Sequence, residues 1–305
     1  MDRAIGIIGA PSSAGAFSPG QEKAPEALRR AGLVDRLRDA DLVVVDHGDI
    51  PAWRWRPDPG RPRAQNVGDV VTSALNVAEK VRTVLAAGEV ALVLGGDCTV
   101  GLGTVAGHLP NDKKLGLVYF DLHPDLNVPD SVPEGALDWM GVAHMLGEDQ
   151  AVPELREFGP RQPLLDNDQL LLFAYAREHA TPWELEVIQR RSLRTVPLEE
   201  VAAHPEAAAA AALQRAEIGW DKLLIHFDVD TVDFTDAPLS ENTGRNSGLP
   251  LHAALLALET LVQSSRLSAL TITELNPDHG AEDGSTIDRF VEGLVGCLAG
   301  VPASA

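Results

Sequence analysis

The stretch LGLVYFDLHPDLN, residues 115–127, joins a buried strand to a set of polar side chains. Residues 115–120 are apolar or small on both sides of the strand, which is typical of a parallel sheet covered by helices. Asp121, His123 and Asp125 follow at alternate positions, and such side chains project to the same side of an extended segment. We therefore expect them to lie together at the carboxyl end of a strand, where open α/β sheets bind ligands.

Strand-like runs recur along the chain and alternate with helical patterns. The other runs are 4–10, 42–46, 90–96, 169–175, 194–198, 222–230 and 267–275. One helical pattern has Leu28, Leu33 and Leu37 on its core face, a second extends from about Val70 to Leu85, and the Ala run 207–212 fits a third. This alternation predicts one α/β domain over residues 1–305, because no linker or repeat interrupts it.

The composition restricts the class of protein and of partner. The 305 residues are 45% apolar and 23% charged, as in an ordinary soluble protein. The net charge of -20 argues against nucleic-acid or membrane-surface partners and favours a small cationic substrate. Two cysteines, Cys98 and Cys297, cannot form a disulfide framework, and no signal peptide or membrane-spanning run is present. We expect a cytoplasmic protein.

Four of the predicted strands end in residues that can carry chemistry. These ends are Gly95-Gly96-Asp97-Cys98-Thr99, Asp121–Asn127, Asp228-Val229-Asp230 and Glu274-Leu275-Asn276-Pro277. Taken singly, each fits a tight turn, a helix cap or a solvated turn. Together they place acids, a His and a Cys at one edge of the sheet, where buried carboxylates would repel one another without a cation. Carboxylate and imidazole ligands suit divalent transition metals.

The order of these motifs resembles that of the ureohydrolase superfamily, which includes arginase, agmatinase and formiminoglutamase. GGDCTVGLGT (95–104) is similar to the family's GGDHS motif, and DLHPDLN (121–127) is similar to DAHxDxN. FDVDTVD (227–233) resembles DVDxxD, and TELNP (273–277) resembles the late (S/T)E-x-NP motif. Several motifs in the right order are more specific than one. The Cys at the first metal-ligand position makes the chain closest in style to N-hydroxyarginine hydrolase-like members.

The resemblance implies a three-layer α/β/α fold around an eight-stranded, mostly parallel sheet. It also implies two divalent metals, most often Mn²⁺, bridged by hydroxide, and a homo-oligomer, either a trimer or a hexamer. By position, the metal ligands are Cys98, Asp121, His123, Asp125, Asp228 and Asp230, with Asp121 and Asp228 bridging. Asp125 would also orient the hydroxide, Glu274 would pair with the guanidinium group, and Asn127 would hold the polar end of the substrate.

Cys98 departs from the family motif, which has His at this position. A thiolate is a softer ligand than imidazole and favours Zn, Fe or Co over Mn. The alternative is that Cys98 is a small buried hydrophobe beside a weakened metal site. Both interpretations are open from the sequence.

Asp138 is the second departure, because arginases have a proton-shuttling His at this spacing. An Asp is a poorer shuttle near neutral pH unless burial or the neighbouring Glu134 raises its pKa. His144 is interpreted as a helix-face histidine without a catalytic role. Glu134 and Glu178 are candidates for substrate binding, and for Glu178 the alternative is a solvated surface acid.

These observations predict a binuclear-metal hydrolase that cleaves a C–N bond of a guanidine-type substrate. The predicted substrate is N-hydroxy-L-arginine or a related arginine derivative, and the products are hydroxyurea or a urea and an ornithine-like amine. The alternatives are an arginase, an agmatinase or another guanidino- or formimino-acid hydrolase. A catalytically silent homologue, which binds a small cation or serves in an assembly, is the alternative from a different class.

The loop 53–63 carries Arg54, Arg56, Arg61 and Arg63 in an otherwise acidic chain. It has three interpretations: contact with a substrate carboxylate, packing on a neighbouring subunit, or a solvated loop with partly packed Trp53 and Trp55.

Overall fold

The computed structural model describes residues 4–109, 114–217, 219–241, 243 and 246–299. All eight predicted strands are present: β1 (Ile5–Gly9), β2 (Val44–Asp49), β3 (Val90–Leu94), β4 (Leu115–Phe120), β5 (Leu170–Tyr175), β6 (Arg194–Pro197), β7 (Lys222–Asp228) and β8 (Leu267–Thr273). They form one sheet in the order β2-β1-β3-β8-β7-β4-β5-β6, and every neighbouring pair is parallel. The eight-stranded α/β fold is confirmed, with a sheet that is wholly parallel.

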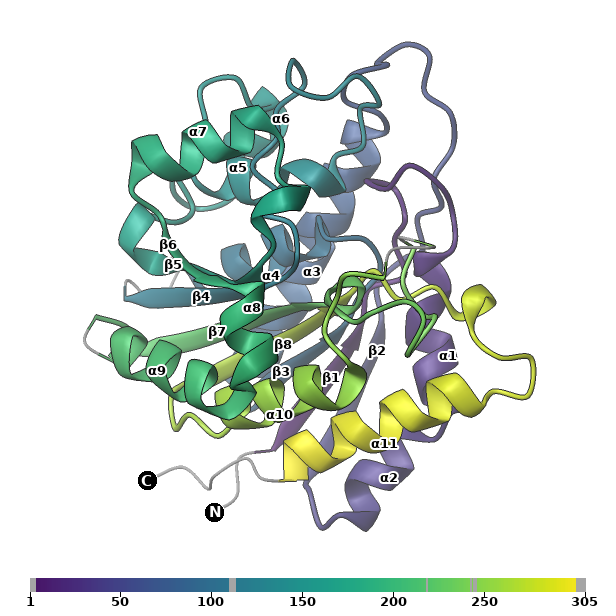
Figure 1. Cartoon of the computed structure of the whole chain (residues 1–305). Helices are drawn as coiled ribbons and strands as arrows, with labels where there is room; N and C mark the ends of the chain where they lie inside the picture. The colour runs from purple at the N-terminus through teal and green to yellow at the C-terminus, as the bar shows by residue number, and fades with distance from the viewer. Residues whose placement is uncertain (1–3, 110–113, 218, 242, 244–245, 300–305) are drawn as a thin grey trace.

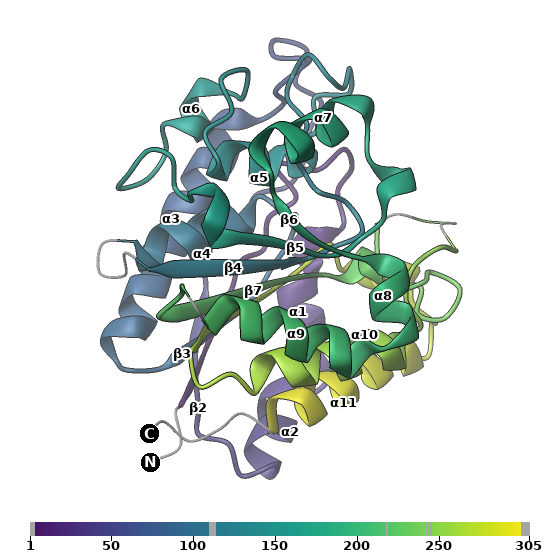
Figure 2. The ribbon, with the colours of Figure 1, turned by 60° about the vertical axis from the view of Figure 1, so that its left-hand side comes forward.

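Helices cover both faces of the sheet (Figure 1). One face packs against α1 (Ala24–Arg30), α2 (Leu33–Asp39), α8 (Leu198–Ala203), α9 (Pro205–Glu217), α10 (Leu251–Val262) and α11 (Ser285–Ala299). The other face packs against α3 (Val67–Ala86), α4 (Val100–His108), α5 (Gly141–Met145), α6 (Pro153–Arg156) and α7 (Pro182–Arg191). Figure 2 shows α3 to α7 on one side of the strands and α8 to α11 on the other. Each layer encloses its own apolar core.

Two of the helix predictions hold, and one is wrong. The pattern through Val70 belongs to the twenty-residue α3, and the Ala run lies in α9. The pattern through Leu28, Leu33 and Leu37 forms two helices rather than one, although all three side chains are fully buried. The break comes at Gly32, which has a φ of 80° and so ends one helix before the next begins.

The strands that carry the four motifs are neighbours in the middle of the sheet. β3 and β4 follow one another in the sequence, but β8 and β7 lie between them. The carboxyl ends of all four strands therefore meet at one point of the sheet edge. The assignment of residues 1–305 to a single domain stays a prediction, because both termini lie outside the described residues. In the described part of the chain, no helix is long and apolar enough to span a bilayer.

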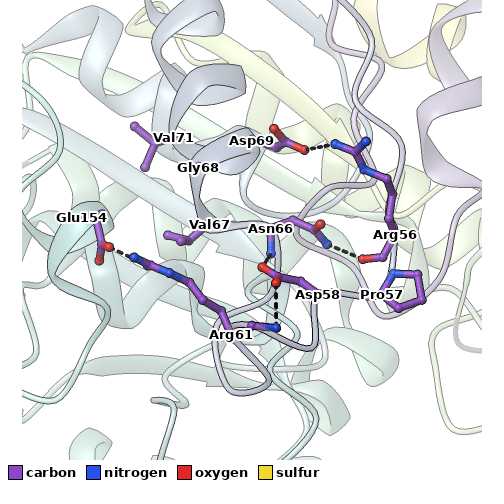
Figure 3. Close-up of a pocket in the computed structure, with 11 residues that line it drawn as sticks. Arg56, Pro57, Asp58, Arg61, Asn66, Val67, Gly68, Asp69, Val71 and Glu154 are labelled. Atoms are coloured by element: carbon purple, nitrogen blue, oxygen red, sulfur yellow. Dashed lines mark hydrogen bonds and ion pairs between the residues drawn. The ribbon is translucent and has the colours of Figure 1, made fainter.

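The arginine-rich loop 53–63 lies on the surface and is tied down by ion pairs. Its guanidinium groups pair with acids of the same chain: Arg54 with Glu22, Arg56 with Asp69, Arg61 with Glu154, and Arg63 with Asp130. Figure 3 shows two of these pairs beside a cavity of about 700 Å³. Trp53 and Trp55 are half-buried, which agrees with a solvated loop whose tryptophans are partly packed.

Candidate active site

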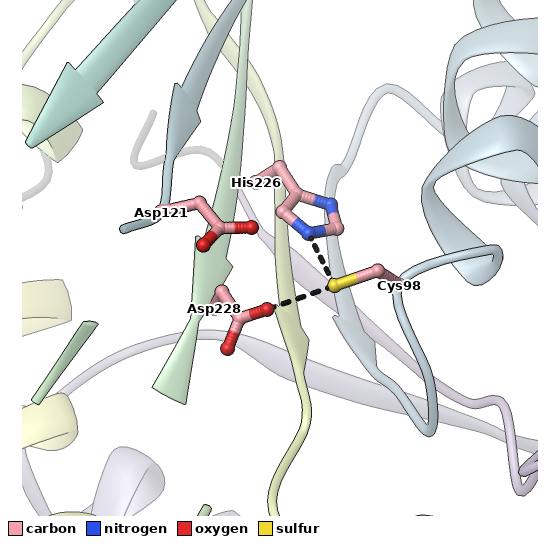
Figure 4. Close-up of side chains that lie close together, drawn as sticks. All are labelled: Cys98, Asp121, His226 and Asp228. Carbon is pink, nitrogen blue, oxygen red and sulfur yellow. Dashed lines mark hydrogen bonds between the residues drawn. The ribbon is translucent and has the colours of Figure 1, made fainter. Parts of the chain in front are cut away.

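Two groups of metal-ligating side chains lie at the carboxyl ends of the central strands. The first consists of Cys98 after β3, Asp121 after β4, and His226 and Asp228 on β7. One ligand atom from each lies within 4.8 Å of the others, and Figure 4 shows the four side chains pointing toward one another. The second group consists of Asp121, His123 and Asp230, whose ligand atoms also lie within 4.8 Å of one another. The two groups share Asp121.

Cys98 is buried and makes close polar contacts in the first group. Its Sγ donates to Asp228 Oδ2 at 2.9 Å and lies 3.3 Å from His226 Nε2, while its backbone N–H donates to Glu274 Oε1 at 2.9 Å. Burial, together with the negative charges of Asp228 and Glu274, raises the pKa of the Cys98 thiol well above its ordinary value. The sulfur becomes a thiolate ligand only where a cation takes the place of its proton.

His123 connects the carboxylates of the second group. Its Nδ1 lies 3.4 Å from Asp121 Oδ1 and 3.2 Å from Asp230 Oδ2. Burial lowers the pKa of His123, but the charges of the two carboxylates outweigh it and raise the pKa well above its ordinary value. The imidazole is therefore held by acids from two neighbouring strands.

The electrostatics of the site fit a pair of divalent cations. Burial and the nearby Asp230 raise the pKa of Asp121 to about 6, and burial and like charge also raise the pKa values of Asp125 and Asp228. One oxygen of Asp121, Oδ2, is buried without a hydrogen-bond partner among the described residues. Cations would satisfy this oxygen and remove the repulsion, and the thiolate, imidazole and carboxylate donors suit transition-metal dications. The residues present therefore fit the metals that the sequence predicts.

Asp125 and Glu274 are held in strained backbone conformations beside these groups. Asp125 belongs to neither group; its Oδ2 accepts a hydrogen bond from the Tyr119 hydroxyl. Its φ is 47° and that of Glu274 is 59°, a region that residues other than glycine seldom adopt. Such strain is concentrated at functional sites, where the surrounding structure fixes it.

Asp138 is buried next to Glu274, and this neighbour replaces the one expected from the sequence. Burial and the charge of Glu274 raise the pKa of Asp138 well above its ordinary value. Burial was one of the two causes expected from the sequence; Glu134, the other, is an exposed side chain, and the charges that act most on Asp138 are those of Glu274, Asp97 and Asp125. The Asp138 carboxylate accepts a hydrogen bond from the Trp139 N–H at 3.0 Å, and the Asp138 N–H donates to the Gly15 carbonyl at 3.1 Å.

Two adjoining cavities bring most of the predicted residues together. A cavity of about 300 Å³ is lined by His123, Asp125, Asn127, Val132, Pro133, Glu134, Trp139, His179, Thr181 and Glu184. A narrower one is lined by Phe17, Cys98, His123, Asp125, Asp138, Trp139, Asp228, Asp230, Glu241 and Glu274. Asn127 and Glu134 thus line the larger of the two cavities, which is called the outer cavity below. Glu178 is exposed and lines neither of them, so the structure does not bring it to the site.

The sequence analysis missed His226, and a signal for it was present. His226 stands two positions before Asp228 in an otherwise apolar strand, and residues at that spacing share a face of the strand. Burial lowers the pKa of His226 to about 3, so its imidazole is neutral. Gln21 was missed as well, and its Nε2 donates to Glu274 Oε2 at 3.0 Å. His144, by contrast, is a buried side chain of α5 that lines neither cavity.

Comparison with known proteins gives a consistent set of relatives. The model of the Arginase family matches residues 3–295. Arginase-1 of Homo sapiens is 30% identical over 281 residues, covering 91% of this chain and 86% of the relative. The hepatic arginase of Aquarana catesbeiana is 29% identical over 302 residues, covering 97% and 93%. The solved structure of the arginase from Bacillus caldovelox superposes with a TM-score of 0.86 at 25% identity, covering 98% and 99%.

Proposed function

The chain belongs to the arginase family, and from this membership and the site geometry we propose that it is a metal-dependent hydrolase of guanidine-type substrates. The observation that carries the proposal is the pair of ligand groups that share Asp121. Two separate donor sets joined by one carboxylate suit two neighbouring cations. A lone metal site or a buried packing cluster gives no reason for the second set.

In this proposal Cys98, Asp121 and Asp228 would hold one cation, and Asp121, His123 and Asp230 would hold the other, with Asp125 beside them. When bound, such cations would lower the pKa of a water molecule and provide a nucleophile at neutral pH. We propose Mn²⁺ as the metal, with Co, Fe and Zn as alternatives because the thiol of Cys98 is a soft ligand.

The other side chains act on the substrate. The Glu274 carboxylate pairs with the guanidinium group and orients its carbon. The raised pKa of Asp138 lets its carboxyl keep a proton to a higher pH than an ordinary Asp, so it can give a proton to the leaving nitrogen. The oxygen of water adds to the guanidine carbon, the C–N bond to the side chain breaks, and the amine leaves with that proton. One proton of the water then restores Asp138, and the other leaves with the amine, which departs as an ammonium ion.

We propose N-hydroxy-L-arginine or a related arginine derivative as the substrate, with hydroxyurea and ornithine as the products. Cys98 and Asp138 support this choice, because both depart from the arginase motif at positions that handle the nucleophile and the proton. Asn127 and Glu134 line the outer cavity and would contact the distal end of the substrate.

L-Arginine is the second candidate, because the relatives described above are named arginases. The test is a comparison of kcat/KM for the two substrates, with ornithine release as the common readout. We expect N-hydroxyarginine to be preferred by at least about tenfold, which is a difference of about 1.4 kcal/mol in transition-state binding. A preference for arginine would identify an arginase. No release from either substrate by protein loaded with two metals would indicate the silent homologue.

The same substrates give a sharper control in variants that restore the family residues. Cys98→His with Asp138→His should raise the arginine to hydroxyarginine ratio of kcat/KM by at least about tenfold if these two positions set the preference.

We also propose a cytoplasmic trimer or hexamer. Light scattering of the purified protein measures the oligomer, and fractionation of the source cells measures the location.

A further inference from the structure

His226 is a buried imidazole in the first ligand group that the family motifs leave unexplained. It lies on β7 two residues before Asp228, so both side chains are on the same face of the strand. In the sheet it lies opposite Tyr119 of β4 and Thr271 of β8. Only 1% of its surface is exposed, so the ring has a fixed environment on all sides.

The surroundings of the ring direct one nitrogen into the site. The ring stacks on Tyr119 with a centroid separation of 4.2 Å and an interplanar angle of 13°. Nδ1 faces Gly101, where an added Cβ would lie 2.8 Å from it, and has no hydrogen-bond partner among the described residues. Nε2 lies 3.3 Å from Cys98 Sγ and 3.0 Å from Thr273 Oγ1. Among the described residues, the polar contacts of this ring are therefore made by Nε2.

The spacing of these atoms suits donors on one ion. Ligands at the usual 2.0–2.3 Å from a tetrahedral cation lie about 3.3–3.8 Å from one another. The 3.3 Å between Cys98 Sγ and His226 Nε2 lies at the short end of this range, and the four donor atoms of the group are all within 4.8 Å. The unpartnered Oδ2 of Asp121 shows that this group has donor capacity that the chain itself does not use.

We infer that His226 binds the first cation through Nε2, together with Cys98, Asp121 and Asp228, and supplies the imidazole that is missing at position 98. The inference rests on the two-metal hydrolase proposed above. The family motif has its imidazole at the position of Cys98, in the loop after β3. In this chain the loop supplies a sulfur ligand, and the imidazole comes from β7. For this first cation, the resulting set of one sulfur, one nitrogen and two carboxylates shifts the preference from the Mn²⁺ proposed above toward Co, Zn or Fe.

A purely structural role for His226 makes a different prediction. If the ring served only to pack on Tyr119, His226→Phe would preserve the stacked ring and leave metal binding intact. If Nε2 is a ligand, His226→Phe and His226→Gln should both lower the binding affinity for one of the two cations by at least about tenfold. His144→Gln is the matched control, because it removes a buried imidazole that lies outside both cavities.

The experiment is a titration of the metal-free full-length protein with Co²⁺. Its readouts are the cobalt bound per chain after desalting, the ligand-field bands and the thiolate charge-transfer band. The wild-type protein and His144→Gln should bind two Co²⁺ and show the thiolate band. His226→Phe should retain one tightly bound Co²⁺. Adding Cys98→His to His226→Phe should restore the second Co²⁺ without the thiolate band, because the imidazole is again present.

The outcomes separate this inference from the proposed function. Two Co²⁺ per chain with unchanged affinity and ligand-field bands in His226→Phe would overturn the role of His226 and leave the two-metal hydrolase standing. A wild-type protein that binds no Co²⁺ would overturn both. Circular dichroism identifies any variant that has not folded, and His226→Gln then replaces His226→Phe.

Discussion

Asp228 belongs to the first ligand group, and we expect its negative charge to matter for function only where cations are bound. It is 2% exposed, and burial together with Asp230 and Asp121 raises its pKa. Asp228→Asn removes a ligand charge while preserving the shape of the side chain. We expect turnover to fall by more than about a hundredfold, since even residues that only support metal ligands contribute about 10–100-fold.

The stability of metal-free Asp228→Asn should be equal to or higher than that of the wild-type protein, because the neutral amide relieves repulsion from the other carboxylates. Substrate turnover and chemical denaturation measure the two effects. Glu292→Gln, at an exposed position of α11, is the control that should change neither. Full activity in Asp228→Asn would refute the two-metal assignment.

Asp138 is expected to act in its protonated form. Its raised pKa means that the carboxyl keeps its proton to a higher pH than an ordinary Asp. Activity should therefore be lost as pH rises through that pKa, because the leaving amine then receives no proton. Asp138→Asn should lower kcat by about 10²–10⁴-fold and leave the number of bound metals unchanged. A pH profile of kcat with a metal count checks both, and a variant with normal kcat would exclude Asp138 as the proton donor.

At the scale of residues, the sequence located the acids but not their partners. Asp121, Asp228 and Glu274 could be placed because they follow strands directly. His226 was hidden, because it lies inside an apolar strand and becomes informative only when β7 is seen beside the loop of Cys98. Which charge acts on Asp138 depended on a contact across the chain, and no local pattern in the sequence encodes such contacts.

At the scale of elements, hydrophobic patterns predicted all eight strands to within a few residues. The order of the strands could not be read in this way, because β7 and β8 are last in the sequence yet lie between β3 and β4. The break between α1 and α2 also escaped, although the spacing held a signal for it: Leu33 comes five residues after Leu28, which puts the two about 140° apart around a single helix. Patterns report which face of an element is buried, and they do not report its neighbours.

The loop that follows β3 is expected to be intolerant of even one added carbon. A Cβ at Gly96 would lie 1.7 Å from the backbone carbonyl oxygen of Ser12, and Asp97 N donates to that same oxygen at 2.8 Å. Gly96→Ala must therefore displace the loop that carries Cys98. We expect a loss of about 1–3 kcal/mol of unfolding free energy and weaker metal binding.

Gly296→Ala is the matched control, because this exposed glycine of α11 has open space around it. It should stabilise the protein by about 0.5–1 kcal/mol through helix propensity. Denaturation midpoints of the two variants decide the matter, and equal stability of Gly96→Ala and the wild-type protein would mean that the loop packs more loosely than the contact implies.

At the scale of the whole molecule, His144 should make the fold sensitive to acid. Burial lowers its pKa from 6.5 to about 4, so the unfolded chain binds a proton in this range that the folded chain does not. Its contribution to stability is complete above pH 6.5 and is lost as the pH falls to about 4. The advantage of the wild-type protein over His144→Gln should shrink by roughly 3 kcal/mol between pH 7 and pH 4. Denaturation in the presence of a chelator measures it, and a difference independent of pH would contradict the assignment.

Removal of metal should destabilise the whole fold, because the ligands come from three strands at the centre of the sheet, β3, β4 and β7. A cation present at a hundred times its dissociation constant adds about 2.7 kcal/mol per site. The gain should be smaller at pH 5 than at pH 7.5. Protons compete for ligands with raised pKa values, such as Asp121 with a pKa of about 6. Melting temperatures with chelator, with Co²⁺ and with Mg²⁺ at both pH values measure these effects. Mg²⁺ should give the smallest shift, because it prefers oxygen ligands over sulfur and nitrogen. An equal shift with Mg²⁺ would show that the carboxylates alone bind the ion, and would remove Cys98 and His226 from the metal site.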